Sequence, residues 1–467
     1  MYRQIRFYSN TPKTYKNIPT FKKLPIIGHG YLFRPKGEFS IERLTEAIKT
    51  LSSRVGPIFK LNLNGEDVVI TLNADDVKTI VKNEGQLPQR PIFPALAHYR
   101  KKNFHCAGIV PENGESWLSN RQLINPLLKS SVTLKYLNKQ QEIAEDFVNY
   151  LISERNSNGI VDDIFSHTMK FTIEAISMVS PGNRYHCLSK DCEHAQKIMN
   201  ASIEFMDGLY KTLIAPPIWK LVKTKAYKML ESSHQIIYES IETDLKNIYN
   251  QYQKNPGVIS ENNPFMFELL RRKHVDWNQF VMLSMEIFLG GIDSTATTLA
   301  MLLHYLSHNT EIQDKARAAS LAGDTMYLRA CIQETLRLSP TAGAHARYLV
   351  NDTIISGYRV PKKTLVMAFL SITSTDEKYY ENPFDFKPER WLNKSNKNMF
   401  ASLPFGYGVR MCPGRRLAEQ EIIVAIKEIL RQLILKPMDS ANIGMIYRMN
   451  RVADRPIRIK IDTNTNC

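Results

Sequence analysis

Helical periodicity runs from about residue 115 to residue 337, and it limits what this chain can fold into more than any other feature. Apolar residues recur there at spacings of three and four, which is the pattern of helices that bury one face. The spacing predicts helices over the following ranges: 133–155, 194–213, 223–253, 277–308 and 325–338. This pattern predicts a mostly helical core.

Shorter, alternating segments flank the helical stretch and predict a small β portion. Residues 57–72 alternate around Asn64-Gly65, which is typical of a β-hairpin. Short strands are expected between 347 and 369, a final helix over 415–435, and a closing strand in VADRPIRIKI. The sequence shows no internal repeat and no low-complexity linker. It therefore predicts one large domain over residues 18–467, mostly α with a small β portion.

The N-terminus is basic and contains no acidic residue before Glu38. Eight of the 61 lysines and arginines precede that residue, so 53 basic residues face 46 acidic ones in the remainder. A basic, acid-free start that contains hydroxyl residues predicts a mitochondrial transit peptide over 1–17, and Arg6-Phe7-Tyr8-Ser9 resembles a matrix-processing site. A frayed basic tail is the other interpretation.

Charge and hydropathy also bear on the classes of partner. After the basic N-terminal segment the net charge is only modestly positive, and the sequence contains no recognisable nucleic-acid-binding module. We therefore predict no nucleic-acid role. No stretch approaches 18 consecutive apolar residues, so we expect no transmembrane anchor.

A glycine-rich loop, PFGYGVRMCPG over 404–414, surrounds Cys412 with Gly406, Gly408, Gly414 and Arg410. A helix is predicted directly after Cys412-Pro413, and the positive end of its dipole favours a thiolate. Such a thiolate is a nucleophile, a zinc ligand or a haem ligand. The loop lacks the histidine that a nucleophile needs and the further ligands that zinc needs. It offers one thiolate, space for a flat ring and a cation, so haem fits best. A buried structural cysteine is the alternative.

Gly290-Gly291-Ile292-Asp293-Ser294-Thr295 interrupts the apolar pattern of the helix at 277–308. Two glycines in a helix interior cost about 1 kcal/mol each relative to alanine. A carboxylate among apolar residues also needs a partner or a task. The pattern predicts a distorted helical turn beside a cavity where protons move. A tight crossing of two helices is the competing interpretation.

Two further pairs of residues share helix faces at close spacing. Glu334 and Arg337 lie at i, i+3, and Pro388-Glu389-Arg390-Trp391 follows downstream, so a buried charge network is possible. Trp117 and Arg121 lie at i, i+4, a spacing compatible with an arginine that holds a propionate beside an aromatic ring. Judged alone, the first pair is more typical of a solvated surface pair, and packing with a surface charge explains the second pair better.

One cluster imitates a metal site. His186-Cys187 and Cys192-x-His194 place two thiols and two imidazoles within nine residues. The two halves are crowded together without a knuckle between them, so we expect no metal there. The six cysteines show no paired framework that would indicate disulfides.

Taken together, these motifs resemble those of the cytochrome P-450 family. Phe405-x-x-Gly408-x-Arg410-x-Cys412-x-Gly414 matches the haem-ligand signature of that family, and the other motifs follow in its order. The resemblance implies the P-450 fold, haem b as cofactor and Cys412 as axial ligand of the iron. It implies further roles for matching residues: Trp117, Arg121, Arg347 and Arg410 as propionate ligands, Phe405, Gly408 and Gly414 as cofactor-loop residues, Glu334, Arg337 and Arg390 as a structural charge triad, and Asp293, Ser294 and Thr295 as the proton-delivery residues.

Within the family, residues 346–366 and 412–421 are similar to the mitochondrial animal group. The similarity implies a monooxygenase on the matrix side of the inner membrane, peripherally attached and supplied by an adrenodoxin-like ferredoxin and its NADPH-dependent reductase. Arg329, Arg415 and Arg416 are the expected docking residues, while Gln333 stands where the group often has a basic residue. Ser294 stands where the family commonly has threonine, so we expect proton delivery to be kept and its coupling to be less certain.

The resemblance implies O₂-dependent hydroxylation of a lipophilic substrate. A sterol or ecdysteroid-like substrate is the leading interpretation, and a lipophilic xenobiotic is the second. A haem-thiolate sensor or isomerase that consumes no O₂ is the interpretation of another class. Expected pocket segments are 92–110, 288–295 and 341–346.

Overall fold

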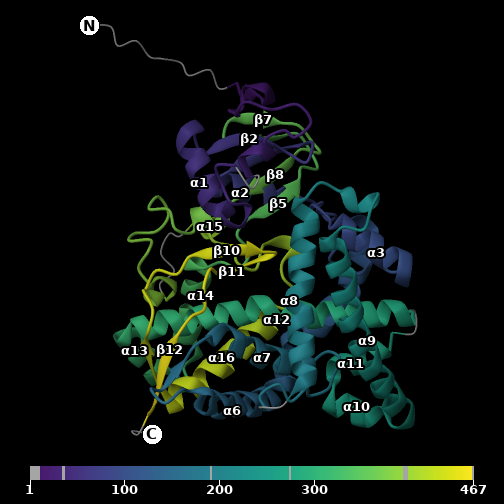
Figure 1. Ribbon diagram of the computed structural model, residues 1–467, viewed down its shortest axis with the longest axis vertical. Coiled ribbons are helices and arrows are strands. Elements are labelled where there is room, and N and C mark those ends of the chain that lie inside the picture. The colour runs from purple at the N-terminus through teal and green to yellow at the C-terminus, as the bar shows by residue number, and fades with distance from the viewer. Residues whose placement is uncertain (1–10, 34–36, 190–191, 273–274, 393–397, 465–467) are drawn as a thin grey trace.

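The computed structural model describes residues 11–33, 37–189, 192–272, 275–392 and 398–464. Many of the strands lie towards the end of the molecule that carries the N-terminus, while others lie above the central helix and near the C-terminus, and helices fill most of the rest (Figure 1). The helices have these bounds: α1 Leu44–Val55, α2 Ala74–Lys82, α3 Pro94–Phe104, α4 Gly114–Ile124, α5 Ser130–Thr133, α6 Leu137–Glu154, α7 Ile164–Ser177, α8 Glu193–Ile214, α9 Lys225–Lys254, α10 Pro256–Asn262, α11 Pro264–Leu270, α12 Trp277–His308, α13 Thr310–Leu321, α14 Thr325–Leu338, α15 Leu370–Thr373 and α16 Arg415–Gln432. The predicted class, mostly α with a small β portion, is confirmed.

The strands form four small sheets. The first has the order β2-β3-β8-β5, with β3 and β8 parallel and the other pairs antiparallel. The others are β1-β7-β6, β4-β12-β9 and the hairpin β10-β11. The strands have these bounds: β1 Lys13–Thr14, β2 Ile58–Leu63, β3 Glu66–Thr71, β4 Ile160–Val161, β5 His345–Tyr348, β6 Thr353–Ile355, β7 Tyr358–Val360, β8 Leu365–Ala368, β9 Leu433–Pro437, β10 Met445–Arg448, β11 Asn450–Ala453 and β12 Ile459–Thr463.

The predicted hairpin over 57–72 is confirmed as β2 and β3. Asn64 and Gly65 both adopt positive φ angles, 51° and 86°. A two-residue turn with positive φ at both positions matches the twist of the strands that it joins. This hairpin forms the edge of the largest sheet.

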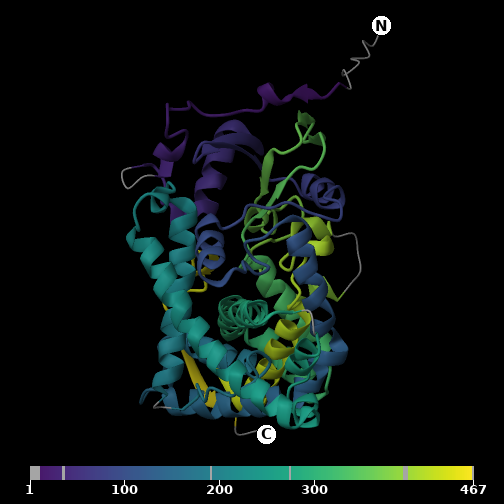
Figure 2. The same ribbon diagram turned by 90° about the vertical axis from the view of Figure 1, so that its right-hand side faces the viewer.

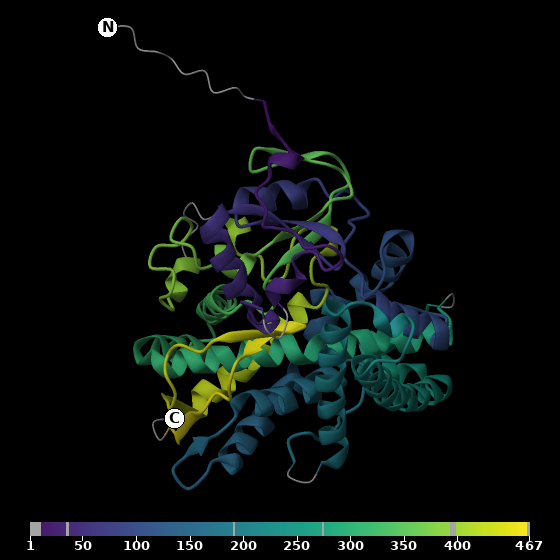
Figure 3. The same ribbon diagram turned by 45° about the horizontal axis from the view of Figure 1, so that its top comes forward.

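Helix α12 is the central element of the fold, and Figure 2 looks along it with other helices around it. It has the predicted bounds, and Asp276 caps its start by accepting a hydrogen bond from the Gln279 amide at 2.8 Å. Among the described residues it is the helix long and apolar enough to cross a membrane, but most of it is buried inside the protein. Its apolar character is therefore that of a core helix. Figure 3 shows how it spans the molecule.

The sequence placed several boundaries wrongly. The segment 133–155 is broken into α5, a 3₁₀ turn over 134–136 and α6. The final helix ends at Gln432, and the residues after it extend as β9. VADRPIRIKI divides between β11 and β12, because Pro456 lies between them and offers no amide hydrogen for a ladder.

The start of the described chain bears on the leader predicted over 1–17. Residues 1–10 lie outside the described residues. Lys13 and Thr14 already pair in parallel with β7, and the Lys13 amide donates to the Gly357 carbonyl at 2.9 Å. The folded domain therefore begins a few residues before the predicted boundary.

Candidate functional site

The loop over 404–414 folds back on itself before α16 begins. The Cys412 amide donates to the Phe405 carbonyl at 2.8 Å, and Gly406 and Gly408 adopt positive φ angles of 74° and 71°. A β-carbon on Gly408 would stand 2.7 Å from a carboxylate oxygen of Glu84, so this position also needs glycine for space. Cys412 consequently lies just before the N-terminus of α16, as the sequence predicts.

Gly414 does not need the conformational freedom of glycine. It caps α16 with φ at −81°, an ordinary value for any residue, and a β-carbon there would meet nothing within 4 Å. At the other end of the loop, the Phe405 ring stacks under the Arg415 guanidinium, 5.3 Å from its centroid. The backbone conformation therefore favours glycine at Gly406 and Gly408 but not at Gly414.

The Cys412 side chain lies deep in the protein and is nevertheless exposed, so it lines an opening in the interior. Burial raises the pKa of the Cys412 thiol, although the amides of Gly414 and Arg415 and the charges of Arg121 and Arg415 lower it. The amides at the helix start therefore favour the thiolate, as the sequence predicts, while burial opposes it. A bound metal cation deprotonates such a thiol outright.

Helix α4 supplies Trp117 and Arg121, both buried. Arg121 donates to the Val409 and Met411 carbonyls of the cysteine loop at 3.2 and 2.8 Å. The Trp117 ring lies beneath the Arg410 guanidinium, 4.2 Å from its centroid. The structure therefore joins the predicted Trp117–Arg121 pair directly to the loop that carries Cys412.

Arg410 and Arg347 approach the same region from two elements. Arg410 donates to the Asn113 side chain and to the Glu112 carbonyl, each at 2.5 Å. Arg347, on β5, donates to Glu84 at 2.7 Å. Burial raises the pKa of the Glu84 carboxyl even though Arg347 and Arg410 lower it.

A fourth arginine, Arg90, joins this cluster, and sequence reasoning missed it. Burial and the positive charges of Arg347 and Arg121 lower the pKa of Arg90 to about 10. Burial and the positive charges of Arg90, Arg347 and Arg121 likewise lower the pKa of Arg410 to about 9. Arg90 lies in a loop outside every motif, so no local pattern distinguishes it from a surface arginine.

The arginine cluster fits the carboxylates of haem. The buried Nε atoms of Arg90, Arg121 and Arg410 have no hydrogen-bond partner within the part of the chain that the structure describes. Several buried guanidinium groups with spare donors form a site for a compact dianion, because like charges otherwise repel one another. The two propionates of haem would meet that requirement.

On α12, Gly290-Gly291 causes no distortion: the residues are α-helical throughout, so the predicted distorted turn is wrong. A β-carbon on Gly291 would stand 2.6 Å from the side chain of Ile176 on α7, so this glycine serves a tight crossing of two helices. A β-carbon on Gly290 would meet nothing within 4 Å. Gly290 therefore faces open space, as expected beside a cavity.

Asp293 is held from the β10-β11 hairpin, which lies along α12 (Figure 1). The Asn450 amide donates to the Asp293 carboxylate at 2.7 Å. Burial raises the pKa of Asp293, although the Asn450 hydrogen bond lowers it. Ser294 is half-buried and its hydroxyl is 3.5 Å from the Gly290 carbonyl, while Thr295 is buried. Nothing in the sequence pointed to Asn450.

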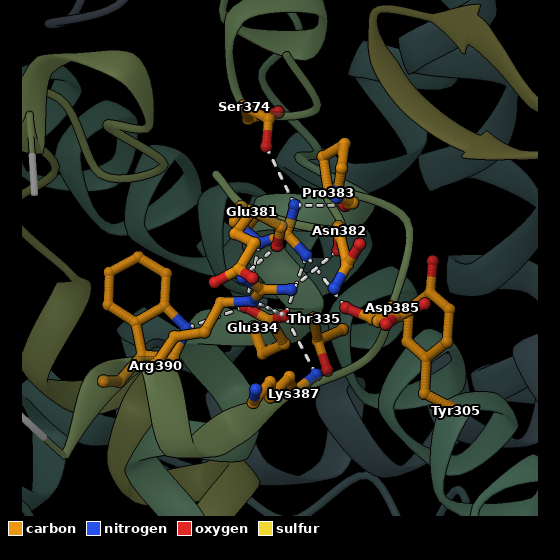
Figure 4. A network of polar contacts seen from close by, with 12 residues as sticks. Tyr305, Glu334, Thr335, Ser374, Glu381, Asn382, Pro383, Asp385, Lys387 and Arg390 are labelled. Carbon is orange, nitrogen blue, oxygen red and sulfur yellow. Dashed lines mark hydrogen bonds and ion pairs between the residues drawn. The ribbon is translucent and has the colours of Figure 1, made fainter. Parts of the chain in front are cut away.

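Glu334, Arg337 and Arg390 meet in one buried network, shown in Figure 4. Arg337 donates to both carboxylate oxygens of Glu334, at 2.9 and 2.7 Å, and Arg390 donates to one of them at 3.1 Å. The Trp391 indole donates to the other oxygen at 2.9 Å. The structure thus brings the predicted triad together, with the Glu334 side chain fully buried.

The three arginines predicted for docking lie on α14 and α16. Arg329 and Arg415 both form ion pairs with Glu419, at 3.1 and 2.8 Å. Arg416 is exposed. All three therefore lie near the end of α16 that follows Cys412.

Residues 190–191 of the Cys/His cluster at 186–194 lie outside the described residues. No group of three metal-ligating side chains is found among the described residues. Cys192 instead donates from its sulfur to the Tyr185 carbonyl at 3.1 Å, and Cys187 is buried.

The chain is similar to known proteins along nearly its whole length. The family model "Cytochrome P450" matches residues 18–462. The chain is 29% identical to probable cytochrome P450 49a1 of Drosophila melanogaster, over 96% of this chain and 83% of that protein. It is 26% identical to the mitochondrial cholesterol side-chain cleavage enzyme of Rattus norvegicus (96% and 88% covered) and 26% identical to the mitochondrial 1,25-dihydroxyvitamin D(3) 24-hydroxylase of Mus musculus (90% and 84% covered).

The family match agrees with the site: a lone cysteine before a helix, arginines that fit two propionates, and an acid on the central helix. The P450 family binds the iron of haem b through a cysteine thiolate. This chain belongs to the cytochrome P450 family and is a haem-dependent monooxygenase.

Proposed function

We propose that this P450 hydroxylates a sterol or ecdysteroid-like lipophilic substrate in mitochondria, using O₂ and electrons from an adrenodoxin-like ferredoxin with its NADPH-dependent reductase. The observation that carries the proposal is similarity over 96% and 90% of the chain to two enzymes whose names state a mitochondrial location and cholesterol or 1,25-dihydroxyvitamin D(3) as substrate. The basic N-terminal segment supports the same location.

In this proposal Cys412 would bind the haem iron through its thiolate, and Arg121, Arg347, Arg410 and the unpredicted Arg90 would hold the propionates. Haem supplies the oxygen chemistry when it is bound. Trp117 supports the arginines from one side, because its ring lies against the Arg410 guanidinium. Stacked and hydrogen-bonded guanidinium groups lose little freedom when they bind an anion, so the site is preorganised.

Asp293 and Ser294 are the proposed proton carriers. Burial keeps the pKa of Asp293 above its usual value, which makes this carboxyl a better proton donor near neutral pH than an exposed aspartate. Asn450 fixes one carboxylate oxygen, so the other is free to exchange a proton with Ser294 or water. Thr295, the next residue, is buried, and in the proposal its hydroxyl can assist proton transfer.

Replacing Asp293 with asparagine is expected to lower product formation by about 100-fold, because a positioned proton carrier contributes about that factor or more. NADPH consumption should continue and appear as hydrogen peroxide. Ser294→Thr, which keeps the hydroxyl, serves as the matched control and should form product at the wild-type rate. The measurement is product and peroxide formed per NADPH. Unchanged product per NADPH in Asp293→Asn would contradict the assignment.

The docking proposal rests on where the basic residues lie. Arg329, Arg415 and Arg416 lie near the Cys412 end of α16, and the first two form ion pairs with Glu419. An acidic ferredoxin bound there would lie beside the loop that carries Cys412. Such an electrostatic match weakens as salt rises.

Peripheral membrane attachment is supported by the connection between α8 and α9. Ile218, Leu221 and Val222 are exposed there, with exposed fractions of 54%, 89% and 67%. Lys220, Lys223 and Lys225 lie between and beside them in the sequence. Exposed apolar side chains flanked by lysines are typical of a surface that rests on anionic lipid.

We place the end of the leader before Lys13, since that residue belongs to β1.

The proposed function is tested by spin-state titration followed by reconstituted turnover. Cholesterol and ecdysone are expected to shift the haem spin state, and their turnover should need ferredoxin and reductase and should fall at high salt. Binding of only a xenobiotic such as 7-ethoxycoumarin would contradict the sterol assignment. Turnover with microsomal reductase alone would contradict the mitochondrial one. A spin shift without substrate-dependent NADPH consumption would indicate a sensor or isomerase.

A further inference from the structure

Another buried ion pair joins α3 to α12. Arg100 of α3 and Glu286 of α12 are paired at 2.5 Å, with side chains 1% and 4% exposed. Arg100 also donates from Nε to the His234 imidazole of α9 at 2.9 Å. Burial and the charge of Arg100 lower the pKa of His234 well below its usual value, so the ring accepts this bond in its neutral form. Burying such a pair has a large desolvation cost, which raises the question of what it does.

Glu286 binds the backbone that connects α3 with α4. It accepts hydrogen bonds from the amides of Ile109 and Val110 at 2.5 and 3.2 Å. Arg100 donates to the Ala107 carbonyl of the same segment at 3.0 Å. Gly108 has a positive φ, and a β-carbon there would stand 2.6 Å from the Glu286 carboxylate. The ion pair thus binds the backbone of residues 107–110 through hydrogen bonds and packs closely against Gly108.

The other end of this segment binds the arginines of the haem site. Arg90 donates to the Val110 carbonyl at 2.9 Å, and Arg410 donates to the Glu112 carbonyl and the Asn113 side chain. We call residues 107–113 the connecting segment. It joins Glu286 on α12 to Arg410 in the cysteine loop through its own backbone.

The connecting segment also borders the space in front of α12. Glu286, Gly290 and Asp293 are spaced i, i+4 and i+7, so they share one face of the helix. Gly290 faces open space on that face. The segment gripped by Glu286 therefore lies at the edge of the same space, two turns from Asp293.

We propose that Arg100 and Glu286 are positioning residues that fix the connecting segment as a wall of the ligand chamber and, through it, hold Arg410 in place. The wall keeps its position because each end is bound by a charged side chain. The proposal requires haem binding and does not depend on the proposed substrate or redox partner.

The test compares holoenzyme of the wild type with Glu286→Gln. A glutamine has one acceptor oxygen where the glutamate has two, so some of the hydrogen bonds that Glu286 accepts from the connecting segment and from Arg100 are lost. We expect hydrogen exchange of the amides over 107–110 to rise about tenfold, the factor that corresponds to about 1.4 kcal/mol. The rate constant for association of 4-phenylimidazole, followed by the haem absorption change, should rise relative to that of imidazole, because the bulkier ligand depends more on displacement of the wall.

Lys101→Met is the matched control. Lys101 follows Arg100 on α3 and pairs with Glu112 of the connecting segment at 2.9 Å, but its side chain is 62% exposed. Neither exchange over 107–110 nor the ratio of the two association rates should change in this variant. If Glu286→Gln does not retain haem, the double variant Arg100→Met, Glu286→Leu takes its place, since it leaves no unpaired charge. Wild-type exchange and an unchanged ratio in a haem-loaded variant would overturn the proposal.

Discussion

Replacing Cys412 with serine is expected to abolish monooxygenase activity and the red-shifted Soret band of the reduced carbon monoxide complex. Serine is nearly the same size but offers an alcohol in place of a thiolate, and the red shift reports thiolate ligation of the iron. The loop should keep its fold, because the Cys412 amide still donates to the Phe405 carbonyl. The measurements are the reduced-CO spectrum and substrate turnover.

Cys331→Ser is the control for this substitution. Cys331 is buried on α14 among the apolar residues of the core. Its substitution can reduce stability, but the red-shifted band should persist in the folded fraction. A normal reduced-CO band in Cys412→Ser would show that another residue binds the iron.

The second large effect is expected at Glu334, whose substitution by glutamine should destabilise the protein by about 3–5 kcal/mol. Glu334 accepts hydrogen bonds from Arg337, Arg390, the Trp391 indole and the Lys387 amide, all around a carboxylate with no exposed surface. Removing its charge leaves two arginines without an anion. Urea unfolding, followed by haem absorbance and circular dichroism, measures the loss.

Glu311→Gln provides the comparison. Glu311 pairs with Lys315 on α13 at 2.7 Å, but both side chains are largely exposed. An exposed pair of this spacing contributes only about 0.3–0.5 kcal/mol. Equal effects of the two substitutions would show that burial of the Glu334 network adds nothing to its strength.

The sequence predicts an element of this fold well when the residues that determine its bounds lie within or beside that element. The bounds of α12 are predictable because Asp276 caps the helix and the apolar pattern continues without a break. The break between α5 and α6 is not predictable, because residues 133–155 keep helical periodicity through the 3₁₀ turn over 134–136. Periodicity reports which face is buried and not whether every turn is an α-turn.

The same limit applies to the site. Cys412, Arg410 and the residues of the loop follow from one contiguous motif. Arg90 lies close to Arg347 and Asn450 contacts Asp293, in each case more than 150 positions away in the chain, so nothing beside them in the sequence reveals a role. The role of Gly291 was open between a distorted turn and a helix crossing, and only the position of Ile176 decides between them.

That last contact has an evolutionary consequence. A methyl group on residue 291 would collide with Ile176 near its stiff, branched β-carbon, so α7 and α12 cannot accept it without moving apart. Alanine at position 291 becomes acceptable only when position 176 carries a smaller side chain. Among descendants of this gene the two positions should therefore change together, although they lie more than a hundred residues apart in the chain and neither is predicted to touch the haem.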